Sequence, residues 1–87
     1  MSTDETKEAE YFSLEIIAKD RIGLVCEISG AISELNISIL RHRSRVYNNR
    51  NKGMISDFKV EVKAESYNQL KTLIRRLHKI KGVISVQ

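Results

Sequence analysis

Hydrophobic and polar residues alternate along two stretches of the chain, which is the pattern of a β-strand with one buried face. In residues 11–19 the apolar side consists of Phe12, Leu14, Ile16 and Ala18. Residues 54–63 alternate in the same way and carry charged residues on their other side. Residues 37–47 are apolar at both ends and basic in the middle, and residues 83–87 are mostly apolar. We therefore expect four strands.

Two other stretches repeat their apolar residues at spacings of three and four, which indicates amphipathic helices. In residues 23–35 the apolar stripe consists of Leu24, Val25, Ile28, Ala31, Ile32 and Leu35. In residues 66–80 it consists of Leu70, Leu73, Ile74, Leu77 and Ile80. Ser66 and Gln69 fit a capping box at the start of this helix, and Gly82 follows its end as a terminating glycine does.

The order of these elements is βαββαβ, with the turn-forming residues 48–53 as a hairpin loop. This order predicts a ferredoxin-like α+β sandwich, in which a four-stranded antiparallel sheet carries both helices on one face. Residues 1–10 are polar and lack periodicity, so we expect a disordered acidic tail there and one domain over residues 11–87.

The composition agrees with a small folded domain and limits where in the cell we expect the protein. No apolar run is long enough to cross a membrane, and the acidic N-terminus does not resemble a secretory signal. Cys26 is the only cysteine, which excludes an internal disulfide and a Cys-x-x-Cys site. We expect a cytoplasmic protein that does not associate with membranes.

The charge is uneven along the chain. Residues 1–10 hold four acidic residues and one lysine, so the remainder has a net charge of +7. An RNA-recognition motif shares the βαββαβ order, but the positions of its stacking aromatic residues are Met54 and Ser56 here. Nucleic acid is therefore an unlikely partner. The run RHRSR, residues 41–45, either protects an edge strand from aggregation or forms a phosphate-binding strip.

The sequence contains no convincing catalytic set. His42 and His78 have no cysteine or acidic partner at a metal-ligand spacing, and no phosphate-binding glycine loop is present. We interpret Cys26 as an inert, partly buried thiol. The chain is expected not to be an enzyme and to use neither a cofactor nor a metal.

Three short motifs occur in a characteristic order: Asp-Arg-x-Gly-Leu at 20–24, Asn-Ile at 36–37 and Gly-Val-x-x-Val at 82–86. With them the chain resembles an ACT domain, a small regulatory module. It is most similar to the C-terminal ACT domain of RelA/SpoT-type enzymes, which make and degrade guanosine tetraphosphate. The segments DRIGLVCEIS, FKVEVK and LIRRLHKIKGVISV carry this likeness. That group often continues the last strand with an arginine, whereas this chain ends at Gln87.

The resemblance implies a non-catalytic regulatory domain, whose parent protein would be a GTP pyrophosphokinase or a related protein of amino-acid metabolism. Many ACT domains bind an amino acid between two protomers, through the loop before the first helix and the start of the second strand. The matching positions are Asp20, Arg21, Ile22, Gly23, Leu24 and Ser38.

Each of these positions has a chemical role in that interpretation. Asp20 would pair with the ammonium group, the first helical N–H groups would receive the carboxylate, and Ser38 would add a hydrogen bond. Gly23 would let the ligand approach the backbone closely. Ser38 stands where amino-acid-binding members often have asparagine, and Ile22 replaces a frequent proline. In the alternative interpretation Asp20 only caps the helix and Gly23 only permits a tight turn.

The expected partners follow from the same resemblance. We expect an L-amino acid ligand and a weak homodimer, formed through the edge strand 37–47 or through the helices. Arg41, Arg43 and Arg45 oppose the strand-edge mode, because like charges would meet across a two-fold axis. The alternative is a module that contacts other domains of its parent enzyme or the ribosome and binds no small ligand.

Overall fold

A computed structural model describes residues 10–87 of the chain. Its elements are β1 (Glu10–Lys19), α1 (Leu24–Glu34), β2 (Ser38–Asn49), β3 (Gly53–Ala64), α2 (Tyr67–His78) and β4 (Val83–Val86). The predicted βαββαβ order is confirmed. The tail predicted over residues 1–10 lies outside the described residues, apart from Glu10, which is the first residue of β1.

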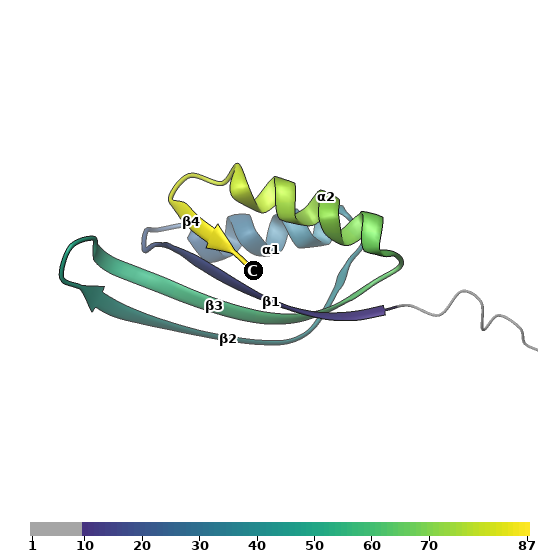
Figure 1. The fold of residues 1–87 in the computed structure, drawn as a ribbon, viewed down its shortest axis with the longest axis horizontal. Coiled ribbons are helices and arrows are strands. Elements are labelled where there is room, and N and C mark those ends of the chain that lie inside the picture. The colour runs from purple at the N-terminus through teal and green to yellow at the C-terminus, as the bar shows by residue number, and fades with distance from the viewer. Residues whose placement is uncertain (1–9) are drawn as a thin grey trace, which may run out of the picture.

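The four strands form one antiparallel sheet in the order β2-β3-β1-β4, and both helices cover the same face of it (Figure 1). The ferredoxin-like α+β sandwich is therefore confirmed. We call the other side of the sheet the open face. The hairpin of β2 and β3 is the longest part of the sheet and extends past the helices (Figure 1). No helix within residues 10–87 is long and apolar enough to span a membrane.

The core lies between the sheet and the two helices. Its fully buried side chains come from the sheet and from both helices: Ile16, Val60, Val62, Leu24, Ile28, Ile32, Leu73 and Leu77. Burying each of these stabilises the fold by about 1.5–3 kcal/mol relative to an exposed side chain. Two predictions for α1 are wrong. Val25 is 49% exposed and Cys26 is exposed, because residues one and two positions after Leu24 turn away from its buried face.

The predicted cap of α2 is present and also ties the two helices together. The Ser66 hydroxyl accepts a hydrogen bond from the Gln69 N–H at 3.1 Å. The Gln69 side chain accepts from the Glu65 N–H at 2.7 Å and donates to the Leu35 carbonyl at 2.6 Å. Leu35 is the residue at the end of α1, so Gln69 fixes the start of one helix to the end of the other.

The structure corrects the comparison with RNA-recognition motifs at β3. Met54 and Ser56 share the alternation of Phe58, which is 2% exposed and belongs to the core, so they do not lie on the open face. The β3 side chains on the open face include Asp57 and Lys59, and none of the β3 residues there is aromatic. This strand therefore offers no surface on which bases stack.

Candidate functional site

The loop from residue 20 to residue 23 joins β1 to α1 and is anchored on both sides. The Asp20 N–H donates to the Met54 carbonyl at 3.0 Å, next to the β2–β3 hairpin. The neighbouring Lys19 N–H donates to the Gly82 carbonyl at 2.9 Å, in the turn before β4. Leu24 is buried, whereas Asp20 and Ile22 are exposed, and Ile22 is 99% exposed. The loop thus presents one carboxylate and one apolar side chain from a fixed backbone.

Gly23 occupies the position directly before α1, with φ 87°. This left-handed conformation favours glycine. A Cβ atom at Gly23 would meet nothing closer than Arg21 Nη1 at 3.9 Å, so the backbone angle, and not lack of space, selects glycine. No side chain caps the helix here. The alternative in which Asp20 caps α1 is therefore wrong, and the Asp20 carboxylate is not used by the helix.

Arg21 is a brace for the loop. Its Nη2 and Nη1 atoms donate to the two carboxylate oxygens of Glu27 at 2.9 and 3.2 Å. Its Nε atom donates to the Lys81 carbonyl at 3.0 Å. The hydrogen bond from Arg21 holds the pKa of the Glu27 carboxyl below its ordinary value. Through these bonds Arg21 positions the loop and α1.

The start of α1 has backbone donors without acceptors. The Leu24 N–H donates to the Arg21 carbonyl and the Glu27 N–H to the Gly23 carbonyl. Within residues 10–87, the N–H groups of Val25 and Cys26 have no hydrogen-bond acceptor. Unused N–H groups and the helix dipole together favour an anionic group at a helix N-terminus.

Ser38 does not lie near this loop within one chain. It is the first residue of β2 and pairs with Lys63, which in turn pairs with Tyr11 near the start of β1. The loop follows Lys19 at the other end of β1. Eight residues of extended strand separate Tyr11, which is level with Ser38, from Lys19, and they span roughly 25 Å. The structure therefore brings residues 20–24 together and leaves Ser38 at the opposite end of the sheet.

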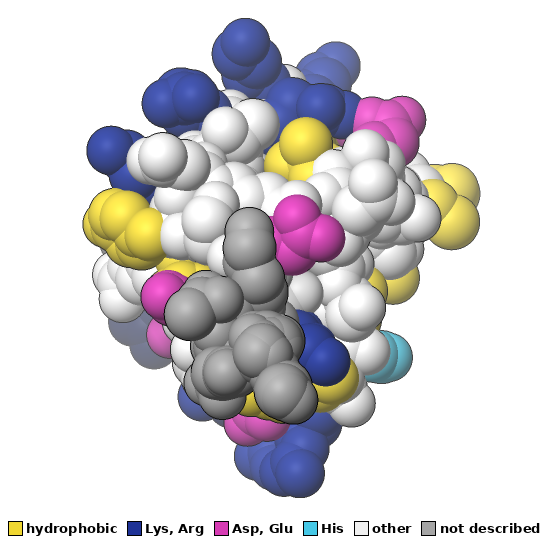
Figure 2. Space-filling view, turned by 90° about the vertical axis from the view of Figure 1, so that its right-hand side faces the viewer, with side chains coloured by type: hydrophobic (Ala, Val, Ile, Leu, Met, Phe, Trp, Pro, Cys, Tyr) yellow, Lys and Arg dark blue, Asp and Glu magenta, His cyan; other side chains and the backbone are white. Residues whose placement is uncertain are grey.

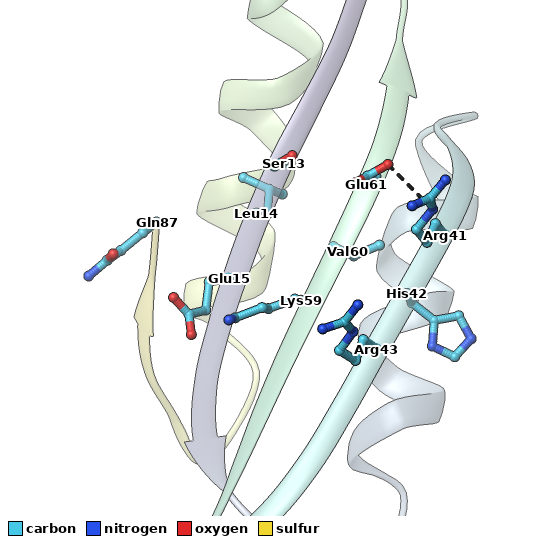
Figure 3. Close-up of a pocket in the computed structure, with 10 residues that line it drawn as sticks. All are labelled: Ser13, Leu14, Glu15, Arg41, His42, Arg43, Lys59, Val60, Glu61 and Gln87. Carbon is cyan, nitrogen blue, oxygen red and sulfur yellow. Dashed lines mark ion pairs between the residues drawn. The ribbon is translucent and has the colours of Figure 1, made fainter.

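A second candidate region is a hollow of about 430 Å³ on the open face, between β1, β2 and β3 (Figure 3). Two cross-strand pairs of β2 and β3 line it, Arg41 with Glu61 and Arg43 with Lys59, and a third pair, Arg45 with Asp57, follows next to it along the strands. The outer two are ion pairs, with nitrogen–oxygen distances of 3.8 and 3.7 Å. Seen end-on, Lys and Arg side chains gather on the sheet side and again over the helices (Figure 2).

Two carboxyl groups interact on the same face. The Asp57 side chain is 7% exposed, and its Oδ1 atom has no hydrogen-bond partner within residues 10–87. Glu15 on β1 has a raised pKa, chiefly because its protonated carboxyl can donate a hydrogen bond to the Asp57 side chain, and then because of burial and the Asp57 charge. Sequence reasoning missed this pair, because the neighbours of Glu15 are set by the register of β1 and β3. No group of three potential metal ligands occurs in residues 10–87.

The fold and the loop define a class of protein: a small βαββαβ module in which an exposed loop opens the first helix and whose described residues hold no group of potential metal ligands. The family model of the ACT domain matches residues 9–87, and the chain belongs to that family. ACT domains are regulatory, so the predicted class of protein is confirmed.

Solved structures agree with this assignment. The crystal structure of the ACT domain from the GTP pyrophosphokinase of Chlorobium tepidum is 25% identical, with a TM-score of 0.69 over 91% of this chain and 96% of that chain. The solution structure of the same domain is 24% identical, with a TM-score of 0.65 over 91% and 84%. The C-terminal domain of the MgtC protein from Mycobacterium tuberculosis, at 15% identity and a TM-score of 0.69 over 98% and 89%, shows the fold alone. The search of curated proteins finds no match.

Proposed function

We propose that this chain is the amino-acid-sensing regulatory domain of a GTP pyrophosphokinase-type enzyme, and that it holds its ligand between two copies. The observation that carries this proposal is that one short stretch of chain holds both an exposed Asp20 and the N–H groups of Val25 and Cys26, which have no acceptor within residues 10–87. One attracts an ammonium group and the other a carboxylate, and a free amino acid carries both. The similarity to the Chlorobium tepidum domain supports the class of parent enzyme.

Two copies are needed to complete the site with Ser38. The outer edge of β2 has no partner strand within residues 10–87. If two β2 edges pair in antiparallel fashion, Ser38 of one copy lies beside the hairpin end of the other. That is the end to which Asp20 is bound through Met54. The loop of one copy and Ser38 of the other, which are far apart within one chain, would then lie at the same end of the paired sheet.

The arginines oppose this pairing less than the sequence alone suggests. Arg41 and Arg45 each have an acidic partner on β3 of the same chain, so their charge is partly neutralised before a second copy approaches. Only Arg43 lacks such a partner within residues 10–87. We therefore keep the weak homodimer, paired through β2, as part of the proposal.

Ile22 favours a second function. A side chain of this size that is 99% exposed gains nothing for the isolated fold, and apolar side chains on loops often contact partners. In this alternative the loop is a contact module that binds another domain of the parent enzyme or the ribosome, without a small ligand.

Calorimetric titration of the folded chain with each of the twenty L-amino acids separates the two functions. The sensing proposal expects heat of binding for at least one amino acid at millimolar concentration. Asp20→Ala should abolish it. No heat with any amino acid would leave the contact module. In that case Ile22→Ser, and not Asp20→Ala, should release the domain from its parent enzyme.

A further inference from the structure

The middle cross-strand pair on the open face breaks the charge pattern of its neighbours. Arg43 on β2 lies directly opposite Lys59 on β3, whereas the pairs before and after it each join an arginine to a carboxylate. Within residues 10–87, neither Arg43 nor Lys59 has a carboxylate within 4.0 Å of its charged nitrogens. Two cations in directly opposite positions repel each other and destabilise the sheet. Lys59 also lies opposite Glu15 on β1, and this carboxylate offsets part of the repulsion from more than 4.0 Å away.

A β-bulge is what turns Arg43 toward Lys59. The pairing of β2 with β3 passes from Ile39 opposite Val62 to Arg41 opposite Glu61, so that Leu40 is an extra residue. One extra residue reverses which side chains face the core. Without it, the arginines at odd positions would point toward the helices, as Ile39 does. The bulge therefore places Arg43 on the open face.

Protection of the sheet edge does not account for the pair. Charged residues on the edge strand alone discourage association with other sheets. Lys59 lies on β3, which is an interior strand, and its position opposite Arg43 adds repulsion without adding charge to the edge. An anion between the two side chains would remove this repulsion.

The hollow gives such an anion a place. Arg43 and Lys59 both line it, and Figure 3 shows the Arg43 guanidinium on the side of Lys59, while the Lys59 side chain extends over β1 toward the Glu15 carboxylate. An arginine fork offers two parallel N–H donors to a phosphate or carboxylate, and lysine adds a point charge. Glu15 repels a second anionic group on its side, so the rest of the ligand must be neutral or carry hydrogen-bond donors.

We propose that the open face of the sheet binds a small ligand through one phosphate or carboxylate group seated between Arg43 and Lys59. This site is separate from the amino-acid site at the loop and does not depend on it. Pairing of two chains through the β2 edge would leave the face accessible, because strands pair in the plane of the sheet.

Titrations of the 87-residue chain at constant ionic strength test this proposal. Inorganic phosphate and acetate are the two probes, followed by the backbone amide shifts of residues 41–45 and 57–61. The probe that binds more tightly shows whether the ligand of this site carries a phosphate or a carboxylate. Arg43→Gln should weaken binding about tenfold, as the loss of a charge-assisted pair does. Arg50→Gln, an equal loss of charge in the hairpin turn, should change it less than about twofold, because Arg50 lies outside the hollow.

Thermal unfolding provides a second test, since Arg43→Gln removes an exposed side chain and should fold. Without the anion this variant should melt at the same temperature as the wild type or higher, and added phosphate or acetate should raise the melting temperature of the wild type alone. Equal weakening by Arg43→Gln and Arg50→Gln, or no shifts with either probe at millimolar concentration, would overturn the proposal. So would tighter binding of a single-stranded oligonucleotide that both variants weaken equally, because that result indicates diffuse attraction of a polyanion.

Discussion

Arg21 and Glu27 form a two-point ion pair across the junction of the β1–α1 loop and the first turn of α1, with nitrogen–oxygen distances of 2.9 and 3.2 Å. Because Arg21 also donates to the Lys81 carbonyl, one side chain holds the loop, α1 and the turn before β4 together. The exposed atoms of the candidate ligand site therefore depend on this brace for their position.

Removing the Arg21–Glu27 pair should lower the stability of the domain, and the size of this decrease should depend on pH. Arg21→Gln should reduce the free energy of unfolding by about 1 kcal/mol, since the pair is partly exposed and a hydrogen bond to Lys81 goes with it. Because Arg21 lowers the pKa of Glu27, the pair stabilises the fold above the unfolded-state pKa of a glutamate and loses this effect as the pH falls through the lower folded-state pKa. Urea unfolding of both proteins across the acid range measures this. A difference that does not shrink in acid would contradict it.

Gly23→Ala should destabilise the domain by about 1 kcal/mol or more and leave it folded, because only the left-handed backbone angle opposes a side chain there. Gly30→Ala is the matched control. Gly30 lies in the middle of α1 with nothing within 4 Å of the added Cβ atom, so this change should stabilise by about 0.5–1 kcal/mol. Chemical denaturation of the two variants should show shifts of opposite sign, and shifts of the same sign would count against this account of Gly23.

Glu15→Gln should stabilise the domain at neutral pH. The neighbouring Asp57 raises the pKa of Glu15, so the folded protein binds a proton there more readily than the unfolded chain. Such a group favours folding below the unfolded-state pKa, and this contribution is lost as the pH rises through the folded-state pKa. The gain from glutamine should therefore be largest near pH 7 and fade as the solution is acidified. Thermal melts over this range check the sign, and a gain that grows in acid would refute it.

Gln69→Ala should cost about 1–2 kcal/mol, because it removes the reciprocal bond of the α2 cap and the bond to the Leu35 carbonyl at the end of α1. Asn68→Ala, at the preceding exposed position, should be nearly neutral. Urea titrations of the two variants compare them directly, and equal effects would show that the link between the helices contributes little.

The fold was predictable because the residues of each helix and strand show its period within the element itself. Alternation and three-to-four spacing located the strands and helices to within about two residues, which is the usual uncertainty of element ends. The hairpin is the largest difference: Asn48 and Asn49 were expected in the loop but end β2. The Asn49 side chain accepts hydrogen bonds from the Asn51 and Lys52 N–H groups, so a shorter turn suffices.

The candidate site was only partly predictable. The loop positions follow from a contiguous motif, whereas the use of Asp20 depended on where α1 begins, and the helix begins after Gly23. The pairs on the open face depended on the register of β2, which a bulge at Leu40 changes. No alternation rule locates an extra residue in a strand, so the opposition of Arg43 and Lys59 could not be foreseen.

In the proposed sensing mode one ligand joins the loop of one copy to Ser38 of another. Backbone NMR during titration with each of the twenty L-amino acids follows both ends of the sheet in one sample. We expect the amides of residues 20–26 and of Ser38 to shift with the same dependence on the concentration of the amino acid, although roughly 25 Å separates them within one chain. Shifts confined to residues 20–26, or no shifts with any amino acid at millimolar concentration, would contradict it.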